Sequence, residues 1–526
     1  MTFLSEHILS VASIIVIGFL AVFVYAGCSS VVVNVKDVNA SVLPQKQKIP
    51  EFIPNTTTLG IVYADELEAH KGESGAFLLS DGTQAFLHRV ALTRMAQKTI
   101  FLQSYIYKDE FASKIFMHEL WEAANRGVQV RILIDDNGLD SDFSDIITLD
   151  SHPNIEVKIF NPYKNRSKLL RYPEMIYDFS RINRRMHNKV FIVDNTALII
   201  GGRNVADDYF DNNTHLNFTD TDVVFIGDVA RSATKSFMKY WEYERSIPAT
   251  LLPSKRSMKN YIKEIEAISE KIATQPSGFL KYDETIKAFM QDYITKQFDM
   301  AWGKAMFIAD TPDKIDKVNP NRPITDALKQ IFAHTTKDVY IAAAYFVPGK
   351  HTIGDLQSLQ DRNIHISVLT NSLASTDSLV VYAAWERYRD IFVKNGVRVY
   401  EYQYEGKKKK SGVRGKLRSG ASLHSKTIVF DERITWVGSF NLDQRSSNLN
   451  TESVVVFENP SFAKKTKANI QEEMADAWQL WCIDDKIFWK GYNKNGEFEI
   501  HQKSPNANIL LRFFNVLAKV LPEDQV

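Results

Sequence analysis

Two copies of one set of polar residues give this chain its clearest chemical signature. Each copy has the pattern His-x-Lys-x4-Asp and is followed by a glycine turn and an asparagine. The first copy comprises His187, Lys189, Asp194, Gly201 and Asn204, and the second comprises His424, Lys426, Asp431, Gly438 and Asn441. Every member recurs 237 positions later. Repetition in register argues against chance, so we expect the two sets to act together.

These residue types suit the cleavage of a phosphodiester without a metal ion. The reaction needs a nucleophile, an acid for the leaving alcohol, and positive charge on the non-bridging oxygens. Imidazole titrates near pH 6.5, so one of His187 and His424 can attack phosphorus while the other is protonated. The attack would give a phosphohistidine intermediate. Lys189 and Lys426 can supply the charge, because an ammonium about 4 Å from a phosphate oxygen contributes on the order of 4 kcal/mol at an effective dielectric of 20.

Further polar residues are candidates for supporting roles. Asn204 and Asn441 follow the glycine turns and are expected to donate hydrogen bonds to the substrate phosphate. Each histidine also needs an acceptor that fixes its tautomer. The candidates are Asp222 in the first half and Glu452 in the second.

For the aspartates of the two sets, Asp194 and Asp431, two interpretations stay open: direct chemistry, or bracing of the turn after the strand. We expect neither a metal ion nor another cofactor, because paired lysines can replace a metal cation. The two cysteines, Cys28 and Cys482, exclude a multi-cysteine zinc site and a disulfide framework.

Alternating strands and helices must position the two sets. The apolar runs Val190–Val193 and Thr427–Phe430 predict buried strands, and residues two apart on a strand share a face, as each His–Lys pair would. The first half predicts helices at Gly82–Gln97 and Ala112–Asn125 and strands at Thr99–Tyr107 and Val128–Ile134. The second half predicts helices at Ile324–His334 and Ser378–Lys394 and strands at Val339–Val347 and Ile364–Thr370. This order predicts an α/β fold with mixed, mostly parallel sheets flanked by helices.

A chain of 526 residues is too long for one core. The predicted divisions are a membrane anchor or lipoprotein signal (1–30), a linker (31–75), a first lobe (76–253), a helical connector (254–322), a second lobe (323–505) and an amphipathic C-terminal helix (506–526). The last helix has two open interpretations, lying in a membrane interface or docking on the core.

The N-terminal segment predicts attachment to a bacterial cell membrane. Ile8–Gly27 is a run of 20 residues without a charge, long enough to cross the hydrocarbon layer as a helix. Cys28 offers the alternative of a lipidated cysteine, and either outcome tethers the protein. The membrane side stays open, because Lys36, Lys46 and Lys48 favour a cytoplasmic catalytic side whereas a lipoprotein would be periplasmic.

Overall charge argues against a nucleic-acid partner. The net charge is +1, so any affinity for anions must be local. The basic run Lys407–Lys410 has two interpretations, a solvated loop or a contact to anionic lipid headgroups.

The paired sets resemble the phospholipase D superfamily, over nearly everything from Ala76 to Trp489. Four stretches are similar to the C-type branch of the bacterial cardiolipin synthases in particular: Asp178–Met186, Leu369–Ala374, Gly420–Leu423 and Gly438–Ser446. The resemblance implies two phospholipase D-like α/β lobes related by a pseudo-two-fold axis, with both sets meeting at one cleft. It implies transfer of a phosphatidyl group onto phosphatidylglycerol, giving cardiolipin, with phosphatidylethanolamine or phosphatidylglycerol as donor.

The resemblance also implies individual roles. His187 would be the nucleophile, and His424 would be the acid and then the base that activates the acceptor alcohol. Gly202 stands where the family often has serine, so Ser439 would supply a substrate contact that the first half lacks. Phospholipid in a membrane is the implied partner, and the need for an accessory protein stays open.

Three other functions stay in competition with a phosphatidyltransferase. A phospholipase D hydrolase would use water in place of the acceptor alcohol and release phosphatidic acid. A nuclease of the same superfamily is disfavoured by the charge and by the lack of interleaved aromatic and basic stretches. A membrane-bound adaptor without catalysis is disfavoured because both sets keep every charged residue.

Overall fold

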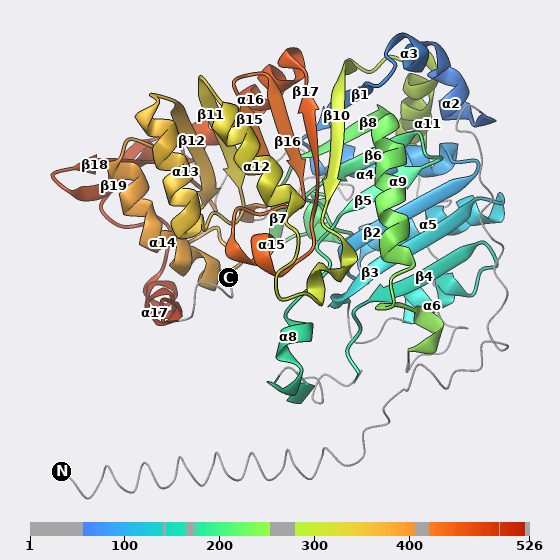
Figure 1. The fold of residues 1–526 in the computed structure, drawn as a ribbon, viewed down its shortest axis with the longest axis horizontal. Coiled ribbons are helices and arrows are strands. Elements are labelled where there is room, and N and C mark those ends of the chain that lie inside the picture. The colour runs from blue at the N-terminus through green and yellow to red at the C-terminus, as the bar shows by residue number, and fades with distance from the viewer. Residues whose placement is uncertain are drawn as a thin grey trace, which may run out of the picture.

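Two α/β lobes lie side by side in the computed structural model (Figure 1). The structure describes residues 56–139, 144–164, 173–174, 176–252, 263, 279–404, 420–493 and 495–520. The predicted N-terminal anchor, Cys28 and the basic run Lys407–Lys410 lie outside the described residues. Within these ranges no helix is both long and apolar enough to cross a membrane.

The first lobe is built on strands that both sequence halves repeat. Its strands are β1 (Ser74–Leu79), β2 (Thr99–Tyr107), β3 (Gln129–Leu139), β4 (Ile155–Phe160), β5 (Val190–Val193), β6 (Ala197–Gly201), β8 (Asp222–Gly227) and β9 (Ser246–Pro248). Its helices are α2 (Thr58–Val62), α3 (Ala64–Ala69), α4 (Gly82–Met95), α5 (Phe111–Asn125), α6 (Ser144–Asp150), α8 (Phe179–Ile182), α9 (Asp228–Trp241) and α11 (Phe279–Thr295). The helices and strands predicted for this half are therefore present, with ends that differ by a few residues.

The second lobe repeats the plan and adds strands at its outer edge. Its strands are β10 (Ala301–Ala309), β11 (Asp338–Ala343), β12 (His365–Asn371), β13 (Arg398–Tyr402), β15 (Lys426–Phe430), β16 (Ile434–Gly438), β17 (Ser453–Glu458), β18 (Trp478–Ile483), β19 (Lys486–Tyr492) and β20 (Phe498–His501). Its helices are α12 (Pro323–His334), α13 (Gly349–Asp361), α14 (Leu379–Lys394), α15 (Gln444–Asn448), α16 (Pro460–Ala475) and α17 (Ile509–Ala518).

The prediction of mostly parallel sheets is wrong, although the α/β class is right. Parallel pairing is confined in each lobe to three strands, β2–β3–β4 and β11–β12–β13. The strands that follow each histidine run antiparallel, as β2–β5–β6–β8–β1 and as β11–β15–β16–β17–β10. A tight turn joins β5 to β6 and another joins β15 to β16. A tight turn reverses the chain, whereas parallel pairing requires a crossover.

Strand β10 joins the two lobes into one hydrogen-bonded sheet. It pairs with β17 along its length and with β1 at its start. The connector predicted to be helical thus contains a strand, although α11 within it is a helix. The predicted linker also ends too late, because Leu59 and Tyr63 are only 0% and 2% exposed and belong to the first core.

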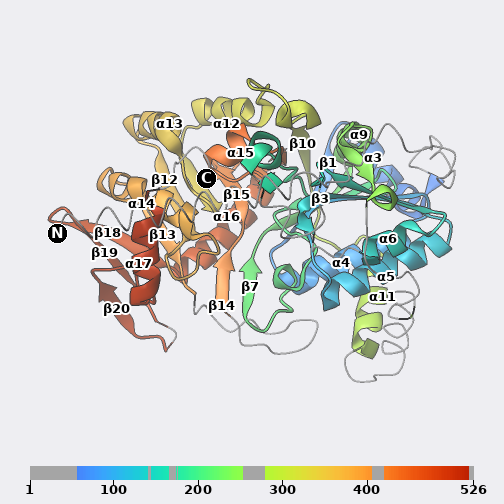
Figure 2. The same ribbon diagram turned by 90° about the horizontal axis from the view of Figure 1, so that it is seen from below.

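A second, smaller sheet crosses between the lobes. Strand β7 (Leu216–Thr219) of the first lobe pairs in parallel with β14 (Gly420–Leu423) of the second, and Figure 2 shows the two side by side. β14 leads directly into His424. This contact therefore positions one predicted catalytic residue by means of the opposite lobe.

Candidate active site

The backbone of each histidine is held by the opposite lobe. His187 N–H donates to the Thr451 carbonyl at 2.9 Å, and Thr451 N–H donates to the Arg185 carbonyl at 2.9 Å. His424 N–H donates to the Thr219 carbonyl at 2.7 Å. The lobes therefore exchange the same kind of contact twice, as a pseudo-two-fold arrangement requires.

The carboxylates that contact the imidazoles are also exchanged between the lobes. His187 Nδ1 lies 2.9 Å from both Oε1 and Oε2 of Glu452. His424 Nδ1 lies 2.7 Å from Oδ2 of Asp220. A neutral histidine that donates from Nδ1 keeps its Nε2 lone pair available, so the arrangement leaves both Nε2 atoms for chemistry. Neither histidine could be oriented in this way by its own lobe.

The prediction that Asp222 orients a histidine is wrong. Asp222 pairs with two buried arginines, Arg89 at 2.9 Å and Arg203 at 3.4 Å. Strand register explains the error. Gly201 pairs with Asp222 in the first lobe and Gly438 pairs with Val454 in the second, so Asp220, and not Asp222, is the counterpart of Glu452.

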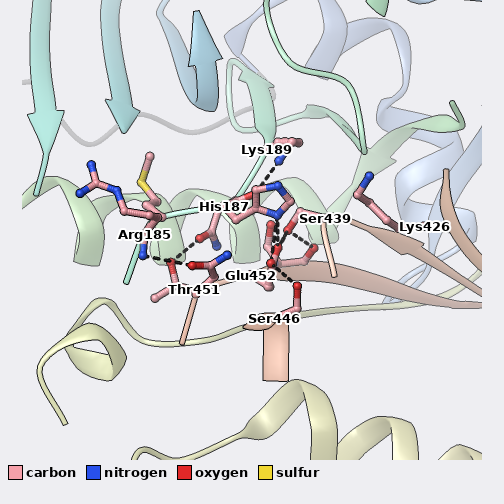
Figure 3. A network of polar contacts seen from close by, with 12 residues as sticks. Arg185, His187, Lys189, Lys426, Ser439, Ser446, Thr451 and Glu452 are labelled. Carbon is pink, nitrogen blue, oxygen red and sulfur yellow. Dashed lines mark hydrogen bonds and ion pairs between the residues drawn. The ribbon is translucent and has the colours of Figure 1, made fainter. Parts of the chain in front are cut away.

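Glu452 is the centre of a larger polar network (Figure 3). Ser446 Oγ donates to its Oε1 at 2.8 Å, and Ser439 Oγ donates to its Oε2. Its own backbone N–H donates to Asp310 Oδ2 at 3.1 Å, and Lys314 Nζ donates to the same oxygen at 2.8 Å. The network holds the carboxylate in one position against His187.

The Ser439 hydroxyl donates to Glu452, so it helps to hold this carboxylate, and its contact with substrate stays a prediction. The first lobe lacks this serine for a steric reason. A Cβ at Gly202 would lie 2.4 Å from Asp220 Oδ2 and 2.5 Å from its Oδ1. In the first lobe the shorter Asp220 side chain lies against the backbone of Gly202. In the second lobe the longer Glu452 side chain leaves room for a serine at the equivalent position, Ser439. The two halves thus hold their carboxylates by different means.

Both lysines are buried at the same centre. The exposed fraction is 3% for Lys189 and 3% for Lys426. Burial lowers the pKa of Lys189 to about 7, Glu452 opposes the shift, and Lys426 adds to it. Burial also lowers the pKa of Lys426. Since each ammonium disfavours its neighbour's charge, the pair is poised to take up an anion, and Figure 3 shows Lys426 reaching toward His187 and Lys189.

Burial disfavours the protonated form of both imidazoles. Burial lowers the pKa of His187 to about 4, with Glu452 opposing the shift. Burial places the pKa of His424 well below its usual value, and Lys426, Lys189 and His187 lower it further. These mutual effects require the two sets to be close in space. The structure thus brings His187, Lys189, His424 and Lys426 together.

Asp194 and Asp431 lie away from this centre. The Asp194 carboxylate accepts backbone N–H groups of Gln97, Lys98 and Thr99 at 2.8–2.9 Å, at the start of β2. Asp431 does the same for residues 336–338, before β11. Both have positive φ values, 50° and 54°, in the turn that follows the strand. They brace that turn, at the end of β5 and β15 that lies away from the histidines, which favours the bracing interpretation over direct chemistry.

Asn204 and Asn441 are buried after their glycine turns, 1% and 4% exposed. The Asn204 side chain accepts the Ile106 N–H at 3.1 Å, so its oxygen supports the C-terminal end of β2. In the described part of the chain no cluster of three or more His, Cys, Asp or Glu residues has the geometry of a metal site.

Sequence reasoning missed Asp220, Asp310 and Lys314. Asp220 had a usable signal, since it precedes an apolar strand just as Glu452 does. Asp310 and Lys314 had none, because only the approach of β17 to the end of β10 brings them to Glu452.

Comparison with known proteins matches this geometry. A family model described as "Cardiolipin synthase, PLD-like domain" matches residues 90–241 and 328–474, the two stretches that carry the histidines. The chain belongs to this family. It is therefore homologous to enzymes of the phospholipase D superfamily.

Relatives cover most of the chain. "Cardiolipin synthase C" of Escherichia coli (strain K12) is 35% identical over 469 residues, covering 86% of this chain and 96% of the relative. An "Uncharacterized protein" of Helicobacter pylori (strain ATCC 700392 / 26695) is 44% identical over 509 residues, covering 97% of this chain and 99% of the relative. A solved phosphatidylserine synthase of Haemophilus influenzae Rd KW20 is similar in fold, with a TM-score of 0.56 at 12% identity, covering 88% of this chain and 100% of that one.

Proposed function

We propose that the chain is a phosphatidyltransferase that makes cardiolipin by moving a phosphatidyl group onto phosphatidylglycerol. The donor is phosphatidylethanolamine or a second phosphatidylglycerol. The observation that carries the proposal is the crossed pair of imidazole–carboxylate contacts, His187–Glu452 and His424–Asp220, around two buried lysines. The similarity to a cardiolipin synthase over 96% of that relative's length supports the choice of acceptor.

The first half-reaction forms a phosphohistidine. Nε2 of His187 attacks phosphorus, and the bond between phosphorus and the headgroup oxygen breaks. His424 delivers its proton to that oxygen, and the headgroup alcohol leaves. Burial disfavours the protonated form of both imidazoles, and a bound phosphodiester anion offsets this effect because an anion stabilises nearby cationic forms.

The second half-reaction regenerates the enzyme. Neutral His424 removes the proton from a glycerol hydroxyl of phosphatidylglycerol, and that oxygen attacks phosphorus. The bond from phosphorus to His187 Nε2 breaks, and cardiolipin is released. Lys189 and Lys426 stabilise the negative charge on the non-bridging oxygens in both steps, where low exposure to water strengthens their effect. Glu452 stabilises the positive charge that His187 acquires.

A lipid-product assay tests the proposal. Purified protein receives labelled phosphatidylglycerol with and without phosphatidylethanolamine, and the products are separated. Cardiolipin is the expected main product, and dominant phosphatidic acid would instead establish a hydrolase. Excess chelator should leave the rate unchanged, because lysines supply the positive charge.

Matched histidine variants test the assigned site. His187→Ala and His424→Ala should each lower turnover by at least about a hundredfold, since nucleophilic and acid–base roles contribute about 10²–10⁴-fold. His334→Ala removes an exposed histidine at the end of α12 and is the control. A loss under about tenfold in either site variant contradicts the roles. With His187→Ala, the acid-labile labelling of the protein by donor lipid that a phosphohistidine would give should also disappear.

A further inference from the structure

Helix α17 turns its polar face toward the protein and its apolar face toward solvent, the reverse of an ordinary surface helix. Its polar side chains face the protein: Arg512 donates to the Ser504 carbonyl at 2.7 Å, and Asn515 donates to Glu386 of α14 at 2.8 Å. Lys519, just after the helix, also lies 2.8 Å from Glu386. An amphipathic helix docked on a core turns its apolar stripe inward, so this arrangement needs another explanation.

The face of α17 that points to solvent is apolar. Its exposed side chains are Ile509 (85%), Leu510 (60%), Phe513 (58%), Phe514 (48%), Val516 (61%) and Leu517 (53%). Val520 follows at 85%. Single exposed apolar residues are ordinary, but a helix face formed from them without interruption marks an interaction surface.

The charge around this face favours an anionic partner. Residues 500–522 contain Lys503, Arg512 and Lys519 and no acidic residue. Glu386, which contacts the helix from α14, is already paired with Lys519 and Asn515. Lys503, just before the helix, is exposed. An exposed apolar helix face with a cationic side chain nearby is typical of a helix that lies in the interface of a bilayer containing anionic lipid.

A second exposed apolar cluster lies near the site. Ile176 (75%), Tyr177 (63%) and Phe179 (48%) occur just before and within α8, on the segment that leads to His187. Figure 1 shows α8 and α17 projecting on the same, lower side of the two lobes. A flat surface could therefore contact both helices at once.

We propose that α17 docks on the surface of an anionic phospholipid bilayer, with the α8 cluster as a second contact. The choice of a bilayer rests on the proposed function, which requires lipid substrates. Docking on this side presents the segment that carries His187 to the membrane in which the substrates lie. The polar contacts of α17 with α14 keep the helix attached to the second lobe while its apolar face enters the interface.

Hydrogen–deuterium exchange on the full chain tests the docking directly. With vesicles of phosphatidylglycerol and phosphatidylethanolamine, the amides of 509–518 should exchange at least about tenfold more slowly than in lipid-free protein. Purely zwitterionic phosphatidylcholine vesicles should give less protection. Equal exchange with and without vesicles, or equal protection by both vesicle types, overturns the proposal. Protection that rises with protein concentration in the absence of lipid overturns it in favour of a second copy of the chain.

A matched pair of variants separates docking from catalysis. The triple variant Leu510→Gln, Phe513→Gln and Leu517→Gln should lose the protection and at least about tenfold of its turnover on vesicles, because it removes three large apolar side chains that would enter the interface. Turnover on dispersed short-chain lipid should be unchanged, which also shows that the variant folds. The control Ile61→Gln changes a residue that is 63% exposed on α2, far from α17 (Figure 1).

Unchanged protection and vesicle turnover in the triple variant would contradict the docking role. The identity of the lipid product is read separately. Protection of α17 without cardiolipin would refute the proposed function alone, and cardiolipin without protection would refute the docking alone.

Discussion

Replacing Asp220 by asparagine, with Asp222→Asn as its control, separates two carboxylates that are two residues apart. Asp220 Oδ2 lies 2.7 Å from His424 Nδ1, whereas Asp222 lies 2.9 Å from a guanidinium nitrogen of Arg89. Asparagine keeps the size of each side chain and removes its charge. The substitution at Asp220 therefore removes the anion that stabilises protonated His424, and its amide group can also select the wrong tautomer.

The size of the effect follows from the distance. A unit charge 2.7 Å from an imidazolium contributes on the order of 6 kcal/mol at an effective dielectric of 20, before the neighbouring cations reduce it. A loss of about 2.7 kcal/mol already corresponds to a hundredfold change in rate. We therefore expect Asp220→Asn to lower kcat by at least about a hundredfold. Its folded structure should persist, because the hydrogen bond from Thr221 N–H to Asp220 can still form.

The control should fail in a different way. Asp222 and its partners Arg89 and Arg203 are all buried, and breaking one side of such a cluster costs about 3–5 kcal/mol of folding free energy. Asp222→Asn should thus unfold at a markedly lower temperature, while the remaining folded molecules keep kcat within a few-fold. Turnover normalised to folded protein, together with thermal unfolding, distinguishes the two. The assignment of the orienting carboxylate is refuted if Asp220→Asn keeps more than a tenth of the wild-type kcat. It is also refuted if Asp222→Asn lowers kcat as much as Asp220→Asn does.

Three further predictions concern the same framework. Asp194→Ala should lower the free energy of unfolding by at least about 2 kcal/mol, since three backbone N–H groups lose their acceptor, with little change in kcat of folded protein; chemical denaturation checks this. Gly202→Ser should displace Asp220 and lower kcat at least about tenfold, whereas Ser439→Gly, which only loosens Glu452, should cost less in the same turnover assay. Burial holds the pKa of His187 at about 4, below the value of about 6.5 in the unfolded chain. As the pH is lowered from 6.5 to 4, the unfolded chain therefore binds an extra proton, and the free energy of unfolding decreases by up to about 1.4 kcal/mol per pH unit. His187→Gln should make this decrease smaller, as measured by thermal unfolding at each pH.

The two halves hold their histidine–carboxylate contacts in the same geometry with different residues, so a single substitution has different consequences in each half. Glu452 needs Ser439 and Ser446 to hold its longer side chain, and Asp220 needs a glycine at 202 to fit at all. Exchanging only one member of either combination should therefore disturb the histidine on the opposite lobe.

The linear sequence determined the family and the local elements. The repeated His-x-Lys-x4-Asp pattern, the apolar strands after it and the helical segments before it are local signals, and β2, α4, α5 and α12 lie where these signals predicted them. The same pattern did not reveal sheet direction, because a buried strand has one hydrophobic pattern whether its neighbour is parallel or antiparallel.

Only the tertiary structure decided which carboxylate serves which histidine. The loop from Asn204 to Asp220 is five residues longer than the loop from Asn441 to Glu452, so a constant offset between the halves does not align the two acids. Pairing of β6 with β8 and of β16 with β17 corrects the register. The tertiary structure also decided that each histidine contacts a carboxylate of the opposite lobe and that α17 turns its apolar face to solvent. Both features depend on contacts between residues more than a hundred positions apart. Local periodicity carries no information at that range.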